Sequence, residues 1–384
     1  MASIPVLDLS WANDPDRKPK LLDQLRAALF EVGFLYIVNH GVDSNIIEAL
    51  TDRLSNLFAL PDEQKAALSK LNSPHFLGYS GFAEEITLGK QDLREQFDFA
   101  TELPVVYDEL RDTAVTDGAL GQRDFTKLYW RLRGPNQWPL ENSVPGFRTA
   151  LTHYHDAVQE LSYRFVHLVE EAVGIPTATF DHFFGRHSQS ASAEAHSHLR
   201  EFLPPQHRIK LLRYPPSVDD TSTGQGAGAH KDSSGWLTFL YQVGEEPGLE
   251  VMSASGDWLP AFPIPDSFVV NFGNAFDAAT EGAVKATIHR VISPGPNSNV
   301  RYSIPFFQGL PLDMTVSEVR SYIPDDVKRR RKESGTWHDE ISSFLDPRWD
   351  SLGDSQLRKW IRSHRDVGLK WYGKEVVDYY EAAG

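Results

Sequence analysis

The spacing of apolar residues predicts mainly helices in the first half of the chain, with short strands at residues 4–9 and 34–38, and strands in the second half. Apolar positions recur every three or four residues, the period of an amphipathic helix, over residues 17–31, 45–58 and 145–174. After His207 the pattern changes to short runs of β-branched and aromatic residues separated by Gly, Pro, Asn, Asp and Ser. These runs lie at residues 209–214, 237–243, 249–252, 268–272, 287–291 and 302–307. Such spacing predicts an all-β sandwich or barrel.

The segments outside these patterns suggest how the chain is organised. Residues 68–145 are irregular, which is typical of long connections that cover a pocket. Residues 221–229 are low in complexity, and the chain beyond residue 316 is charged with scattered Trp and Leu, as expected for helices packed on the outside. We expect one domain over residues 1–384, with a mostly helical region at 1–200, a β core at 205–310 and C-terminal helices at 316–384.

Composition excludes several classes of site and partner. The formal net charge of −15 disfavours a nucleic-acid partner, because phosphate binding requires a basic surface. The absence of cysteine excludes disulfides, thiolate metal sites and cysteine nucleophiles. Neither a signal peptide nor a membrane-spanning stretch is present, so we expect a cytoplasmic protein. The sequence leaves the oligomeric state open.

Two histidines and an aspartate form a candidate metal site. His230 and Asp232 are two residues apart, so on an extended segment both side chains point to one face. His289 follows 57 residues after Asp232, on a β-rich run that can return beside the first pair. A second His-x-Asp triplet, His364 to Asp366, serves as a control, because it lies in a charged tail that we expect to be helical, with no histidine after it.

The ligand types narrow the choice of ion. Two His and one carboxylate on one face leave three positions open, which suits Fe(II) that binds a bidentate cosubstrate and O2. Zinc is the rival ion, and a hydrolytic zinc site would need a nearby Glu as general base. Twelve residues past His289, Arg301 and Ser303 share a face if residues 300–307 form a strand, and they offer a guanidinium and a hydroxyl to one carboxylate.

Seven short motifs in a fixed order resemble a known family. The chain is similar over nearly its whole length to the isopenicillin-N-synthase-like branch of the 2-oxoglutarate- and Fe(II)-dependent dioxygenases. The motifs lie at residues 4–8, 32–41, 212–216, 230–238, 270–273, 285–291 and 301–303.

The resemblance implies a fold, a reaction and a set of residues. The fold would be α+β, mainly β, with a double-stranded β-helix (jelly roll) core between N-terminal and C-terminal helices. His230, Asp232 and His289 would bind Fe(II). Four further residues would hold the cosubstrate 2-oxoglutarate: Arg301 and Ser303 at the distal carboxylate, with Tyr214 and its neighbour Lys210 beside them.

The implied reaction consumes 2-oxoglutarate and O2, releases succinate and CO2, and hydroxylates, desaturates or cyclises a small molecule of specialised metabolism. Three alternatives stay open: a 2-oxoglutarate-independent oxidase like isopenicillin N synthase, an ethylene-forming enzyme, and a jelly-roll binding protein that keeps the metal but performs no redox step. Four aromatic residues are candidates for an apolar pocket wall, although each is more readily explained as core: Trp236, Phe239, Phe272 and Phe306.

Overall fold

Two β-sheets form the centre of the molecule. The computed structural model describes residues 3–110, 123–186, 202–217, 224–232, 235–330 and 351–382. The large sheet has the order β1 (Val6–Asp8), β2 (Phe34–Val38), β12 (Ser267–Phe272), β9 (Leu237–Val243), β14 (Arg301–Gln308), β7 (Arg208–Tyr214), β6 (Glu95–Ala100), β3 (Gly78–Ser80). The small sheet has the order β11 (Trp258–Pro260), β10 (Leu249–Met252), β13 (His289–Ile292), β8 (Gln225–His230). Apart from the parallel pair β1–β2, neighbouring strands in both sheets are antiparallel.

The two sheets pack against each other through a shared apolar cluster. Phe34, Tyr214 and Val269 of the large sheet are buried together with Leu249 and Val291 of the small sheet. Because side chains alternate along a strand, the other face of the large sheet points away from this cluster and needs a second cover.

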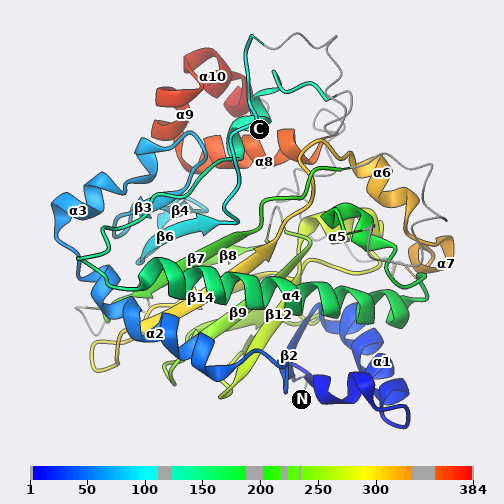
Figure 1. Cartoon of the computed structure of the whole chain (residues 1–384). Helices are drawn as coiled ribbons and strands as arrows, with labels where there is room; N and C mark the ends of the chain where they lie inside the picture. The colour runs from blue at the N-terminus through cyan, green and yellow to red at the C-terminus, as the bar shows by residue number, and fades with distance from the viewer. Residues whose placement is uncertain are drawn as a thin grey trace.

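Helices provide that cover (Figure 1). The apolar sides of α1 (Lys18–Ala27), α2 (Ser44–Phe58) and α4 (Phe147–Val173) join one large core cluster with residues of β2, β9, β12 and β14. Strand β12 is consequently buried at every position. Shorter helices complete this region: α3 (Asp62–Ala67), α5 (Asn274–Ala279), α6 (Val316–Ser321) and α7 (Asp325–Lys328).

The C-terminal helices do more than cover the outside. Helices α8 (Leu352–Ser363), α9 (Arg365–Trp371) and α10 (Lys374–Ala382) share a separate apolar cluster with Phe76 and Trp130. One side of α8 also lines the cavity between the sheets, together with the hairpin β4 (Ile86–Thr87) and β5 (Lys90–Gln91) near its mouth. The expectation that these helices lie only on the outside is therefore wrong for α8.

Most predicted elements are present, and the exceptions have physical reasons. All eight predicted strands and the three long helices appear within a few residues of their expected bounds. The first 200 residues also supply two strands that are not predicted, β3 and β6, to the large sheet. No helix in the described ranges is long and apolar enough to cross a membrane.

Strand β8 is not among the predicted strands, because its glycine-rich sequence overlaps the low-complexity stretch at 221–229. Residues 221–223 of that stretch lie outside the described residues. Close packing explains the glycines. A Cβ on Gly226 would lie 3.0 Å from Cδ1 of Tyr214, and a Cβ on Gly228 would lie 2.6 Å from Cγ2 of Thr87.

Candidate metal centre

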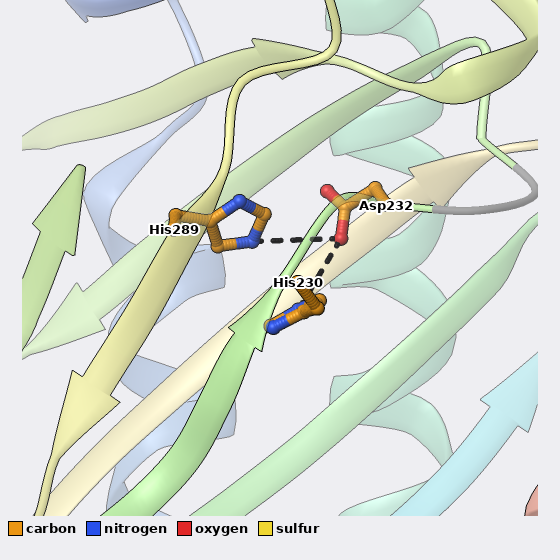
Figure 2. Close-up of side chains that lie close together, drawn as sticks. All are labelled: His230, Asp232 and His289. Atoms are coloured by element: carbon orange, nitrogen blue, oxygen red, sulfur yellow. Dashed lines mark ion pairs between the residues drawn. The ribbon is translucent and has the colours of Figure 1, made fainter. Parts of the chain in front are cut away.

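Strand pairing brings the three predicted metal ligands together. His230 ends β8 and His289 begins β13, and these two residues are direct partners in the antiparallel ladder. Asp232 follows two residues after β8. The Nε2 atoms of His230 and His289 lie 3.8 and 3.6 Å from Oδ1 of Asp232, and Figure 2 shows the three side chains pointing toward one another. Two donors bonded at about 2.0–2.2 Å to one ion lie roughly 3–3.5 Å apart, so these three atoms are close enough to share a metal after small adjustments.

Hydrogen bonds fix which atom of each side chain is free for a metal. Nδ1 of His230 lies 2.7 Å from the Gly228 carbonyl and Nδ1 of His289 lies 3.1 Å from the Thr287 carbonyl. Each Nδ1 therefore donates its proton to the backbone and leaves Nε2 as a lone-pair donor.

The carboxylate is oriented in the same way. Thr238 Oγ1 and Asn271 Nδ2 each donate to Oδ2 of Asp232 at 2.7 Å. Oδ1 remains open toward the two imidazoles. Neither Thr238 nor Asn271 is predicted as a site residue, although both lie inside the motifs at 230–238 and 270–273.

Electrostatics favour the metal-binding protonation states of His230 and Asp232. Burial lowers the pKa of His230, and the charge of His289 lowers it further. Burial would raise the pKa of Asp232, but the two imidazoles and the hydrogen bonds from Asn271 and Thr238 outweigh it and lower the pKa below its usual value. Neutral imidazoles and an ionised carboxylate are the forms that bind a cation.

Alternative sites receive no support within the described residues. The group His230, Asp232 and His289 is the one cluster of potential metal ligands there. Glu85 is the one Glu of the described chain that lines the cavity, and it pairs with Arg94 at 2.6 Å, which makes it a poor general base for a hydrolytic zinc site. His364 of the control triplet instead has its Nε2 3.1 Å from Oε1 of Glu85 and 2.9 Å from Nζ of Lys70.

A cavity of about 810 Å3 opens beside the metal ligands. Strands of both sheets line it, and α8 and the β4 hairpin complete its wall. Arg301 and Ser303 of β14 face this cavity, as their spacing predicts, because both belong to one face of the strand.

Arg301 is a buried cation without an anionic partner. Its side chain is 1% exposed, and no carboxylate of the described chain lies within 4 Å of it. Nη2 donates to Gln242 at 3.0 Å and Nη1 contacts Ser303 Oγ at 3.5 Å, while Nε has no hydrogen-bond partner. Burial lowers the pKa of Arg301, and the Tyr214 ring lies 5.0 Å from its guanidinium carbon. A buried, uncompensated guanidinium is a site for an anionic ligand.

Tyr214 and Lys210 occupy different surroundings, although both face the cavity from β7. Tyr214 interacts with the guanidinium groups of Arg301 and Arg94. Nζ of Lys210 lies 3.7 Å from both Glu85 and Asp98, so this lysine already faces two carboxylates.

The apolar wall of the cavity is formed by residues other than the four aromatic candidates predicted from the sequence. All four candidates, Trp236, Phe239, Phe272 and Phe306, belong to the core between the large sheet and the helices. Phe307, the neighbour of Phe306 on β14, faces the cavity instead, with Leu240 and Phe34. The register of each strand decides this, since adjacent side chains point to opposite faces.

Comparisons with known proteins agree with this geometry. Residues 4–141 match the family described as non-haem dioxygenase in morphine synthesis N-terminal, and residues 206–309 match the 2OG-Fe(II) oxygenase superfamily. The chain is 38% identical over 377 residues to the 2-oxoglutarate-dependent dioxygenase frbJ of Dothideomycetidae sp., covering 96% of this chain and 92% of the relative. It is 31% identical over 381 residues to a 2-oxoglutarate-dependent dioxygenase of Gibberella zeae, covering 96% and 91%.

A solved structure extends the agreement to the fold. The crystal structure of a full-length Neurospora crassa protein in complex with alpha-KG and thymine superposes with a TM-score of 0.65 at 22% identity and covers 94% of this chain and 96% of that chain. The chain therefore belongs to the 2OG-Fe(II) oxygenase superfamily and is a 2-oxoglutarate-dependent dioxygenase, an enzyme whose cofactor and cosubstrate are Fe(II) and 2-oxoglutarate.

Proposed function

We propose that this dioxygenase oxidises a small molecule of specialised metabolism by hydroxylation, desaturation or ring closure, at an iron held inside a double-stranded β-helix. The eight-stranded and four-stranded sheets that pack face to face around the cavity support the jelly-roll assignment. The Neurospora structure contains thymine, and a cavity of about 810 Å3 suits a ligand of that class or somewhat larger.

His230, Asp232 and His289 are the proposed iron ligands. This assignment rests on the convergence of three atoms: Nε2 of His230, Oδ1 of Asp232 and Nε2 of His289. The other polar atom of each side chain is held by a hydrogen bond. Because all three ligands would lie on one side of the ion, the side that faces the cavity would be free to bind the cosubstrate and O2.

Arg301 and Ser303 are the proposed partners of the distal 2-oxoglutarate carboxylate, with Tyr214 beside them. The buried guanidinium has a free Nε and no counter-ion among the described residues, so a carboxylate there would offset the cost of its desolvation. We leave Lys210 out of this cosubstrate site because its Nζ faces Glu85 and Asp98.

When bound, iron and 2-oxoglutarate supply the oxidation, in which O2 converts 2-oxoglutarate to succinate and CO2 and oxidises a substrate C–H bond. The chain's own residues position the reactants. Arg301 fixes one end of the cosubstrate, and Asn271 and Thr238 keep Asp232 in one orientation. The two sheets and α8 restrict the access of water to the site.

Two measurements test the proposal. Anaerobic addition of Fe(II) and 2-oxoglutarate should give a visible metal-to-ligand charge-transfer band in the wild-type protein and none in His289→Ala. A colourless wild-type mixture would contradict the proposal. Succinate formed in step with oxidised substrate excludes an oxidase of the isopenicillin N synthase type, and succinate formed without any added substrate together with ethylene would favour the ethylene-forming alternative.

A further inference from the structure

The cavity concentrates positive charge in an acidic protein. Among the described residues, eight lysines and arginines line it, against two carboxylates, Glu85 and Asp232. The chain as a whole carries a net charge of −15. Arg301 is assigned to the cosubstrate above, so the remaining surplus on the α8 side of the cavity is unexplained.

Lys359 is the clearest part of this surplus. It projects from α8 into the cavity, and no carboxylate of the described chain lies within 4 Å of its Nζ. Burial, together with the charges of Lys210 and Arg208, lowers the pKa of Lys359 to about 8, although the charges of Asp232 and Glu85 act in the opposite direction. The ammonium group is therefore mostly charged at neutral pH, and it lies near enough to Asp232 to sense that carboxylate.

Arg208 adds a second cation, whose hydrogen-bond partners among the described residues are neutral backbone carbonyls. Its guanidinium donates to the backbone carbonyls of His75 at 2.7 Å and Phe76 at 3.2 Å. It also lies 4.5 Å from the centre of the Trp360 ring, which Lys359 approaches at 5.8 Å. Arg208 and Lys359 thus meet at the same aromatic side chain of α8.

Lys210 belongs to a balanced group of charges and not to this surplus. Glu85 pairs with Arg94 at 2.6 Å, and Asp98 pairs with Lys70 at 2.9 Å. Nζ of Lys210 lies 3.7 Å from both. Arg94 also pairs with Asp92 at 3.3 Å. Three carboxylates therefore balance three cations in this group, and the unbalanced positive charge beside α8 comes from Arg208 and Lys359.

We propose that Lys359 and Arg208 bind a carboxylate group of the substrate. A carboxylate between these cations would relieve their mutual repulsion and offset their desolvation. The anchor belongs to α8 and β7, whereas Arg301 belongs to β14, so the structure has separate cationic sites for substrate and cosubstrate. A substrate fixed at Lys359 would present its C–H bonds toward the metal ligands. This inference rests on the proposed function.

The first test uses defined probes. Enzyme loaded with Fe(II) and 2-oxoglutarate is mixed in air with the protein L-amino acids and with short mono- and dicarboxylates, each beside its neutral carboxamide. We expect succinate formation to be stimulated by one or more free carboxylates and not by the matching carboxamides. Equal stimulation by acid and amide, or stimulation by no carboxylate, would overturn the inference.

The second test uses the best carboxylate probe and three variants. Lys359→Met should raise its KM about ten- to hundredfold, the loss expected for one charge-assisted contact, whereas Lys359→Arg should raise it far less. Lys370→Met removes an exposed lysine on α9 outside the cavity and should leave KM unchanged. An unchanged KM in Lys359→Met would contradict the assignment.

The anaerobic charge-transfer titration separates this inference from the proposed function. If the wild-type protein shows no band, the iron and cosubstrate assignment fails first. If the band forms and Lys359→Met weakens 2-oxoglutarate binding as strongly as a change at Arg301, then Lys359 holds the cosubstrate and a substrate carboxylate site is refuted.

Discussion

Replacing Arg301 by methionine tests the cosubstrate site most sharply. Methionine keeps much of the apolar stem but removes the guanidinium, which is 1% exposed and has no carboxylate partner in the described chain. Loss of a hydrogen bond to a charged group costs about 1.5–3 kcal/mol, which corresponds to roughly 10- to 150-fold in Kd. We therefore expect the charge-transfer band to form only at a correspondingly higher 2-oxoglutarate concentration, with Fe(II) content unchanged.

Arg213→Met is the matched control for this change. Arg213 pairs in register with Tyr302, the residue next to Arg301, but it contacts Glu95 at 2.5 Å and does not line the cavity. The control should bind 2-oxoglutarate like the wild type. An unchanged Kd in Arg301→Met, or an equal loss in both variants, would refute the assignment of Arg301.

Three further predictions concern the metal ligands, their support and the fold. His230→Ala and His289→Ala should each lose bound iron and activity together, because the two remaining ligands hold Fe(II) poorly. Metal analysis of the purified variants measures this loss, and retained iron would contradict the assignment of the three ligands. Asn271→Ala removes one of the two hydrogen bonds to Asp232 Oδ2 and should weaken Fe(II) binding about 10- to 100-fold in a chelator competition, so wild-type affinity would count against this role. Burial lowers the pKa of His207 from 6.5 to about 3. The free energy of unfolding should therefore fall as pH drops from 6.5 toward 3, because the unfolded chain then binds one proton more than the folded chain. Denaturant titrations should show a weaker pH dependence for His207→Asn, and identical pH profiles would exclude His207 as a cause of the pH dependence.

The convergence of the proposed metal ligands can be predicted from the sequence because their positions depend on local rules. The i, i+2 spacing of His230 and Asp232 places both on one side of the chain, and His289 lies on a strand that pairs with β8. Arg301 and Ser303 follow the same alternation on β14. In each case, the strand period determines the face.

The residues that escape prediction depend on packing between distant segments. Strand β8 is glycine-rich because Tyr214 and Thr87 approach it closely, and composition alone makes it resemble a loop. Phe306 and Phe307 are equally apolar, so only the register of β14 decides which one faces the cavity. Lys359 lies in a charged C-terminal segment whose sequence is typical of a solvent-exposed helix. Only the packing of α8 against the cavity shows that this lysine faces inward.

The most direct test of the central claim is the position of iron in an anaerobic crystal of the protein with Fe(II) and 2-oxoglutarate. Anomalous diffraction at the iron edge should give one peak within bonding distance of Nε2 of His230, Oδ1 of Asp232 and Nε2 of His289. A peak bound elsewhere, or no peak between these three side chains at full iron loading, would contradict the account.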